Sequence, residues 1–126
     1  MREIKFRAWD EKSQEMLSGD ELEENGRYNI GISYGKPFVA RIHPEWHECG
    51  LMQYTGLKDK NGVEIYEWDI LYWDGSIIGV VSFECCEFIV GEGVSARAMC
   101  AMPADLDIKV IGNIHENPEL LGDNND

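Results

Sequence analysis

Basic residues are scarce in this chain. Eleven Lys and Arg stand against 24 Asp and Glu, which gives 126 residues a formal net charge of −13 at pH 7. The shortage is uneven, because residues 61–96 hold seven acidic residues and no basic one. Proteins bind nucleic acid phosphates through clusters of Lys and Arg. The composition therefore argues against direct DNA or RNA binding, and the simplest role of the excess charge is to keep the protein soluble.

Long apolar runs are also lacking. The first twelve residues, MREIKFRAWDEK, contain no apolar segment of the kind found in signal peptides. No segment approaches the roughly 20 apolar residues that a membrane helix needs. We therefore expect a cytoplasmic protein without a membrane partner.

Cysteine is present without the spacing of a metal or disulfide motif. The four cysteines are Cys49, Cys85, Cys86 and Cys100, and no CxxC pair occurs among them. Adjacent Cys85 and Cys86 would point to opposite faces of a strand. The pattern indicates reduced thiols rather than a disulfide framework.

Helical periodicity is missing over any long stretch, whereas short alternating or β-branched segments are frequent. Residues 4–9 and 15–17 predict an N-terminal hairpin, and residues 18–26 are acidic and polar and predict a loop. Asn117, Pro118 and Glu119 have the order of a helix start, with Asn as the N-cap. Further strands are expected at residues 28–34 (half-buried), 38–42, 77–83, 88–90 and 108–114, with a turn at 35–37; residues 96–102 are either a loop or a loose strand.

The central stretch, residues 51–73, reads as an apolar strand, a charged turn and a second apolar strand. Asn61-Gly62 is a strong turn signal, because both residue types tolerate positive φ. Asp69 marks the entry of the second strand, and Asp74-Gly75 predicts the next turn. The chain thus predicts a mainly β fold, either a small barrel or a β-sandwich, with a short C-terminal helical turn. The pattern at residues 64–70 resembles the strand entry of SH3-like barrels, so an SH3-like barrel is the form of barrel that we expect. We expect one domain over residues 1–126, with a hairpin and variable strands in 1–50, a β core in 51–115 and a turn and tail in 116–126.

Three separated blocks carry a family resemblance: MREIKFRAWD (residues 1–10), LMQYTGLKDKNGVEIYEWDIL (51–71) and VIGNIHENPELL (110–121). Together they resemble the YopX family of phage and prophage proteins. The resemblance implies a gene of a bacterial phage or mobile element, and it brings no assigned activity or catalytic residues. Trp68 stands where the family usually has Gly, and His115 where it usually has Tyr. A Gly before Asp69 would suit a positive-φ backbone that Trp would strain.

Residues His43–Cys49 form the best metal-binding candidate, because the segment offers imidazole, carboxylate and thiol ligands. Pro44 argues against the helix on which a His pair four residues apart would bind zinc, and no second ligand motif follows. A polar loop with a small buried cysteine is the favoured reading, so we expect no metal and no cofactor. Cys85 and Cys86 are poor nucleophiles, because neighbouring Glu84 and Glu87 would raise a thiol pKa.

Glu64, Glu67 and Asp69 could form a carboxylate set, but no phosphate loop or arginine clamp accompanies them. A solvated strand face is the favoured reading. The aromatic residues are the remaining signal, since adjacent Tyr72 and Trp73 should face opposite sides of a strand. Exposed Trp and Tyr often anchor protein interfaces, although a strand buried on both faces would also explain them. The expected partner-binding residues are Trp68, Tyr72, Trp73, Glu67 and Asp69.

These patterns favour a non-enzymatic interaction module that binds a host or phage protein, or a second copy of itself as a homo-oligomer. Two alternatives remain open. One is an acidic decoy that mimics DNA, suggested by the net charge of −10 over residues 51–126. The other is a small metal protein that uses the segment from His43 to Cys49.

Overall fold

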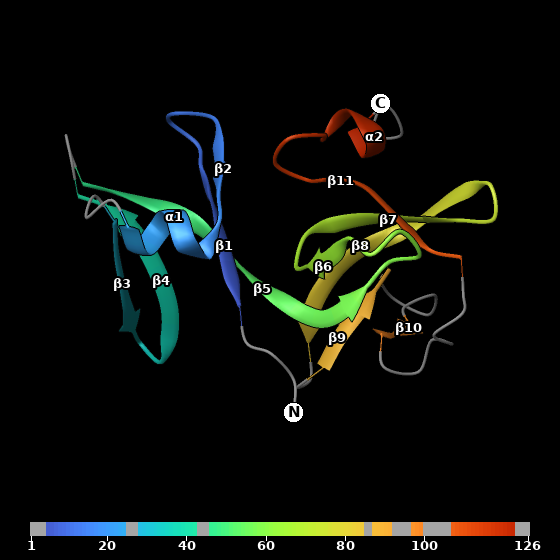
Figure 1. Cartoon of the computed structure of the whole chain (residues 1–126), viewed down its shortest axis with the longest axis horizontal. Coiled ribbons are helices and arrows are strands. Elements are labelled where there is room, and N and C mark those ends of the chain that lie inside the picture. The colour runs from blue at the N-terminus through green and yellow to red at the C-terminus, as the bar shows by residue number, and fades with distance from the viewer. Residues whose placement is uncertain are drawn as a thin grey trace. The chain divides into compact units, whose positions relative to one another are not determined.

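The computed structural model describes residues 5–24, 28–42, 46–84, 87–91, 97–99 and 107–122 (Figure 1). Over these residues the chain forms eleven strands and two short helices, so the predicted mainly β class is confirmed. None of the helices in these ranges is long and apolar enough to cross a membrane. The chain divides into two compact units, residues 1–54 and 55–126. The expected single domain over residues 1–126 stays a prediction.

Unit 1 is an antiparallel sheet in the order β2-β1-β5-β4-β3. The predicted N-terminal hairpin is confirmed, since the first strand pairs with the second through Ala8 and Leu17. The central strand, β5, extends past the unit boundary, so its last residues belong to unit 2. The elements are β1 (Phe6–Asp10), β2 (Glu15–Leu17), α1 (Gly19–Glu24), β3 (Tyr28–Ser33), β4 (Lys36–Arg41) and β5 (His47–Lys58).

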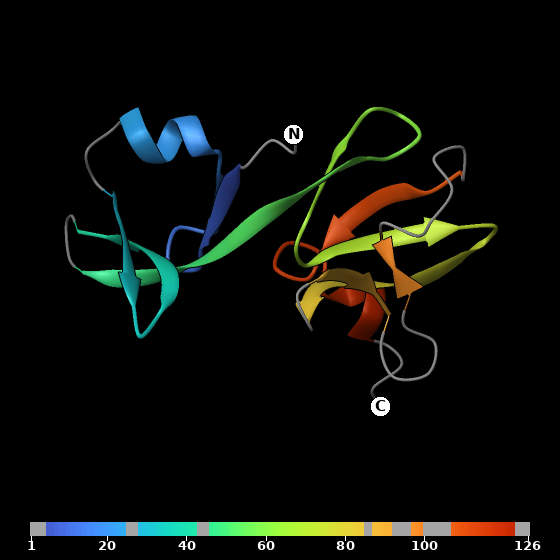
Figure 2. The ribbon, with the colours of Figure 1, turned by 90° about the horizontal axis from the view of Figure 1, so that it is seen from below.

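The segment after β2 is a helix, and the predicted loop over residues 18–26 is wrong there. Ser18 and Glu21 form a capping box: the Glu21 N–H donates to Ser18 Oγ at 3.2 Å, and the Ser18 N–H donates to Glu21 Oε1 at 2.9 Å. Leu22 is 3% exposed and joins the core of unit 1. Helix α1 contacts β1, β2 and β3 (Figure 2). Capping and one buried leucine therefore hold this six-residue segment, whose other five residues are acidic or glycine, in a helix.

One face of this sheet makes the core of unit 1. Leu22 covers it from the helix, and Tyr28 and Leu51 pack at its edge. Cys49 is part of this core at 4% exposure, as expected, but it lies in strand β5 rather than in a loop. The buried members are Ala8, Leu17, Leu22, Val39 and Cys49.

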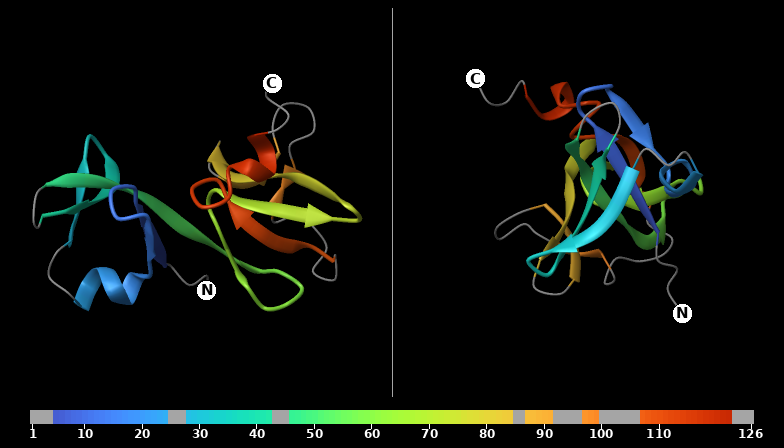
Figure 3. Two further views of the ribbon diagram at one scale, coloured as in Figure 1. Left: turned by 90° about the horizontal axis from the view of Figure 1, so that it is seen from above. Right: turned by 90° about the vertical axis from the view of Figure 1, so that its left-hand side faces the viewer.

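Unit 2 is a second antiparallel sheet, in the order β10-β9-β8-β7-β11, and it curls strongly (Figure 3). β6 pairs with β5 instead. The core cluster consists of Ile65, Leu71, Val81, Phe88, Val90, Met99 and Ile108. The elements are β6 (Glu64–Tyr66), β7 (Asp69–Trp73), β8 (Ser76–Glu84), β9 (Glu87–Val90), β10 (Arg97–Ala98), β11 (Lys109–Asn113) and α2 (Glu119–Gly122).

Both predicted turns of the central stretch are present. Asp74 and Gly75 have φ values of 53° and 87° and join β7 to β8 as a two-residue hairpin loop. Before β6, the buried Asp59 carboxylate accepts the N–H groups of Asn61 and Val63 at 2.8 and 2.9 Å. Its second oxygen accepts the Val110 N–H at 2.9 Å. Asp59 thus ties this turn to β11.

The C-terminal helical turn is also confirmed as α2, but its predicted cap works differently. The Asn117 carbonyl accepts the Leu120 N–H at 3.1 Å. The Asn117 side chain instead accepts the Asn113 N–H at 3.2 Å, so it closes the turn after β11 rather than capping the helix.

Candidate functional site

A cluster of polar side chains lies at one end of the core face of unit 1. The antiparallel register of β1 and β5 brings Asp10 next to Cys49. The same sheet pairs Arg41 with His47, and Tyr28 with Arg41. Because side chains that are opposite each other on neighbouring strands share a face, these five residues converge although they come from four different strands or strand ends of the chain.

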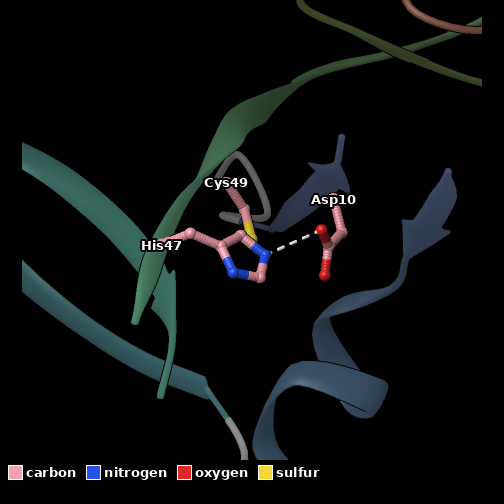
Figure 4. Close-up of side chains that lie close together, drawn as sticks. All are labelled: Asp10, His47 and Cys49. Carbon is pink, nitrogen blue, oxygen red and sulfur yellow. Dashed lines mark hydrogen bonds and ion pairs between the residues drawn. The ribbon is translucent and has the colours of Figure 1, made fainter. Parts of the chain in front are cut away.

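Asp10 is the centre of this cluster and is fully buried. Its Oδ1 lies 2.9 Å from His47 Nε2 (Figure 4). Its Oδ2 lies 3.2 Å from Arg41 Nη1. Three further groups donate to this carboxylate: Tyr28 Oη at 3.4 Å, the Lys12 N–H at 3.1 Å and the Ser13 N–H at 3.4 Å. Burial alone would raise the pKa of Asp10, but the hydrogen bonds from His47, the Ser13 backbone and Arg41 outweigh it and lower the pKa to about 2. The carboxylate is therefore ionised across the physiological range.

Cys49 lies beside this carboxylate, but the pKa of its thiol is shifted in the opposite direction. Burial and the negative charge of Asp10 raise the pKa of the Cys49 thiol to about 11. A nucleophilic cysteine needs a lowered pKa and access to solvent. The grouping of Cys49, His47 and Asp10 therefore has the residue types of a cysteine protease site without its electrostatics.

A second feature is the tip of the β3–β4 hairpin. A hollow of about 470 Å³ opens there, which we call the hairpin hollow; its lining is Ser33, Tyr34, Pro37, Phe38, Trp46 and Glu48. Tyr34 is fully exposed and Trp46 is 62% exposed. The sequence predicted a half-buried strand over residues 28–34, which is wrong at this end, because Ile32 is 78% exposed as well. Apolar side chains gathered in this way are typical of binding surfaces.

The hairpin turn itself carries an unfavourable residue. Tyr34 and Gly35 have φ values of 51° and 77° and connect Ser33 to Lys36 as a two-residue loop. The turn was expected one residue later, at residues 35–37, where Lys36 and Pro37 belong to β4. Asn, Asp and Gly are the residues that suit this left-handed position, and Tyr costs about 1 kcal/mol there. Tyr34 gains no packing in return.

The aromatic residues expected to bind a partner lie elsewhere, in unit 2. Trp68, Tyr72 and Trp73 are each half-buried, and Trp73 packs against the core. Glu67 is half-buried, but Asp69 is 1% exposed, so the predicted solvated strand face is wrong at that residue. Asp69 Oδ2 accepts the Tyr66 N–H at 2.8 Å and closes the turn into β7. Partner binding by this set stays a prediction.

The structure describes only part of the metal-binding candidate at residues 43–49, and that part is a strand. His47 and Cys49 are two residues apart on one strand, whereas His43, Pro44 and Glu45 lie outside the described residues. Cys85, Cys86 and Cys100 lie outside them too. The sequence reasoning missed Asp10, 37 positions before His47, because only the pairing of β1 with β5 brings the two together.

Comparison with known proteins supports the family resemblance of the three sequence blocks. The family model described as "YopX protein" matches residues 5–122. A crystal structure of the protein EF1440 from Enterococcus faecalis is similar, with 29% identity, a TM-score of 0.49, and coverage of 96% of this chain and 99% of that one. The YopX protein of Bacillus subtilis shares 22% identity with a TM-score of 0.55, covering 96% and 97% of the two chains. No curated protein matches. The chain therefore belongs to the YopX family.

Proposed function

We propose that this protein is a non-enzymatic interaction module, encoded by a phage or prophage, that binds a polypeptide partner through the hairpin hollow. The observation that carries the proposal is Tyr34, a fully exposed aromatic side chain in a left-handed turn position. Its placement lowers stability and buries no apolar surface. A strained residue that packing does not explain points to a function in binding.

The neighbouring residues define what such a partner would offer. Tyr34 and Trp46 are the amphipathic aromatic types enriched at interface centres. The ring of Phe38, which also lines the hollow, packs against Gly31, where an added Cβ would stand 2.9 Å from it. Glu48 adds a negative charge at the lining. The hollow therefore suits a segment with an apolar residue beside a basic one.

The test is capture of tagged protein from bacterial host lysate, comparing wild type with the double variant Tyr34→Ser, Trp46→Ser. We expect the double variant to lose the captured protein, because hot-spot aromatic residues dominate binding energy. Val63→Ser is the matched control, since Val63 is also exposed, at 47%, but lies in unit 2. Melting temperatures of all variants show that they are folded. Equal capture by wild type and double variant would refute the proposal.

Two further measurements test where the binding surface lies and whether the partner is a second copy of the chain. Tyr72→Ala tests the aromatic set of unit 2, because loss of capture in this variant alone would move the binding surface there. Light scattering of wild type and the double variant measures their molar masses. An oligomeric wild type with a monomeric double variant would make a second copy of the chain the partner.

A further inference from the structure

We infer that Asp10, His47 and Cys49 form a binding site for one divalent zinc-type ion, with a water molecule as the fourth ligand. The ligand atoms that these three side chains offer, one each, all lie within 4.8 Å of one another. Carboxylate oxygen, imidazole nitrogen and thiolate sulfur are the three ligand types that zinc takes in proteins. Figure 4 shows the three side chains facing a common point from β1 and β5.

The distances require only small movements. In a tetrahedral zinc site, nitrogen and oxygen ligands at about 2.0 Å and sulfur at about 2.3 Å lie roughly 3.3–3.8 Å from one another. Asp10 Oδ1 and His47 Nε2 are 2.9 Å apart. Because the two side chains of β5 are two residues apart on one strand, they keep their common face without any change in the backbone.

The second observation is an unused nitrogen. His47 Nδ1 is buried, and within the described part of the chain it has no hydrogen-bond partner. The ion would bind Nε2, the nitrogen that faces Asp10, and would leave Nδ1 free to hydrogen-bond a water molecule, as the second nitrogen of a metal-bound histidine commonly does.

The charges around the site are compatible with one divalent cation. On binding, Cys49 would release its proton to solvent, so the ion would meet one carboxylate and one thiolate, while Arg41 keeps its ion pair with the same carboxylate at 3.2 Å. Arg41 and the Tyr28 hydroxyl hold the other oxygen of the same carboxylate, Oδ2, and so orient it. This is the role that outer residues take around many metal ligands.

The test uses the purified full chain, stripped of metal, titrated with Co²⁺ and then with Zn²⁺. We expect one Co²⁺ per chain, with the near-ultraviolet band of a thiolate–cobalt bond and the visible bands of a tetrahedral ion, and Zn²⁺ should abolish both. Cys49→Ser should lose the thiolate band. Cys100→Ser is the matched thiol control and should keep it. A wild type without the bands, or a Cys49→Ser variant that keeps the thiolate band, would overturn the inference.

A second measurement guards against a variant that does not fold. Zn²⁺ should raise the melting temperature of wild type and Cys100→Ser, because a ligand that binds only the folded state stabilises it. Zn²⁺ should leave the melting temperatures of Cys49→Ser and His47→Gln unchanged. His47 is partly exposed, so this variant tests the site without opening a cavity in the core. An equal rise in all four proteins would show that zinc binds elsewhere and would also overturn the inference.

Discussion

Trp68 occupies a turn position with a positive φ, which is unfavourable for a residue other than glycine. It lies between β6 and β7 with φ at 69°, at the position where the family resemblance leads us to expect Gly, and its backbone is hydrogen-bonded on both sides. The Trp68 N–H donates to the Val81 carbonyl at 2.8 Å, and the Trp68 carbonyl accepts the Ile114 N–H at 3.0 Å. The turn is therefore present despite the substitution, and these two hydrogen bonds explain why the backbone does not relax.

The strain at Trp68 can be measured by comparing two variants. Trp68→Ala and Trp68→Gly both remove the half-buried ring, but only Gly adopts positive φ freely. We expect the Gly variant to be about 1 kcal/mol more stable than the Ala variant in urea unfolding. At Trp73, in extended β7, the same pair should show the reverse order, because Gly loses more chain entropy. A less stable Gly variant at position 68 would show that no strain is stored there.

Asp10 makes the stability of the protein sensitive to acid. Its pKa is about 2 in the folded protein and near its ordinary value of 3.8 when unfolded. A lowered folded pKa gives stability that is fully present above the unfolded pKa and is lost as the pH falls toward the folded one. The expected loss between pH 5 and pH 2 is about 2 kcal/mol from this group. Asp59, whose pKa is also lowered, adds to it in the same direction.

The measurement is urea unfolding from pH 5 to pH 2, together with a carboxyl-carbon NMR titration. The NMR signal of Asp10 should titrate near pH 2 in the folded protein. Asp10→Asn should show a flatter dependence of unfolding free energy on pH, because it has no proton to gain at this position. A folded-state midpoint near pH 4 would contradict the hydrogen-bonded geometry.

At the scale of the element, local sequence signals predicted most strands and turns. They missed helix α1, which depends on one buried leucine, and the site around Asp10. The turns at Asn61-Gly62 and Asp74-Gly75 could be predicted because the residues of a turn themselves decide whether it forms. The capping box of α1 was also present in the sequence, at Ser18 and Glu21, but the acidic composition of the segment suggested a loop. The site around Asp10 could not be predicted, because strand register over 37 residues is set by the whole sheet.

The turn after β11 depends on close packing between Gly112 and Asn117. A Cβ added at Gly112 would stand 2.5 Å from Asn117 Oδ1, 2.7 Å from its Cγ and 2.9 Å from its Cβ, and only the last of these contacts remains when Asn117 is replaced by Ala. Gly112→Ala should therefore displace the Asn117 side chain from the Asn113 N–H and cost about 2 kcal/mol. The measurement is urea unfolding in a double-mutant cycle with Asn117→Ala. The Gly112→Ala cost should shrink in that background, since the clashing amide is gone; an equal cost in both would place the strain elsewhere.

At the scale of the whole molecule, the charge of −13 acts against the folded state. Folding concentrates the acidic residues, and their mutual repulsion is screened by salt over a Debye length of about 10 Å at 0.1 M. We expect the melting temperature to rise as NaCl increases from 10 to about 200 mM, because screening removes more repulsion than attraction. Surface pairs such as Lys60 and Asp107, whose charged atoms are 3.3 Å apart, weaken with salt but contribute little.

The control separates screening from ion binding and from a general solute effect. KCl at the same ionic strength should give the same rise, and sucrose at the same osmolarity should give a smaller one, because a neutral solute does not screen charge. The effect should also shrink near pH 4.5, the isoelectric point of the sequence, where little net charge is left to repel. A melting temperature that falls with added salt would mean that attractive pairs, rather than the acidic excess, dominate the electrostatics of this protein.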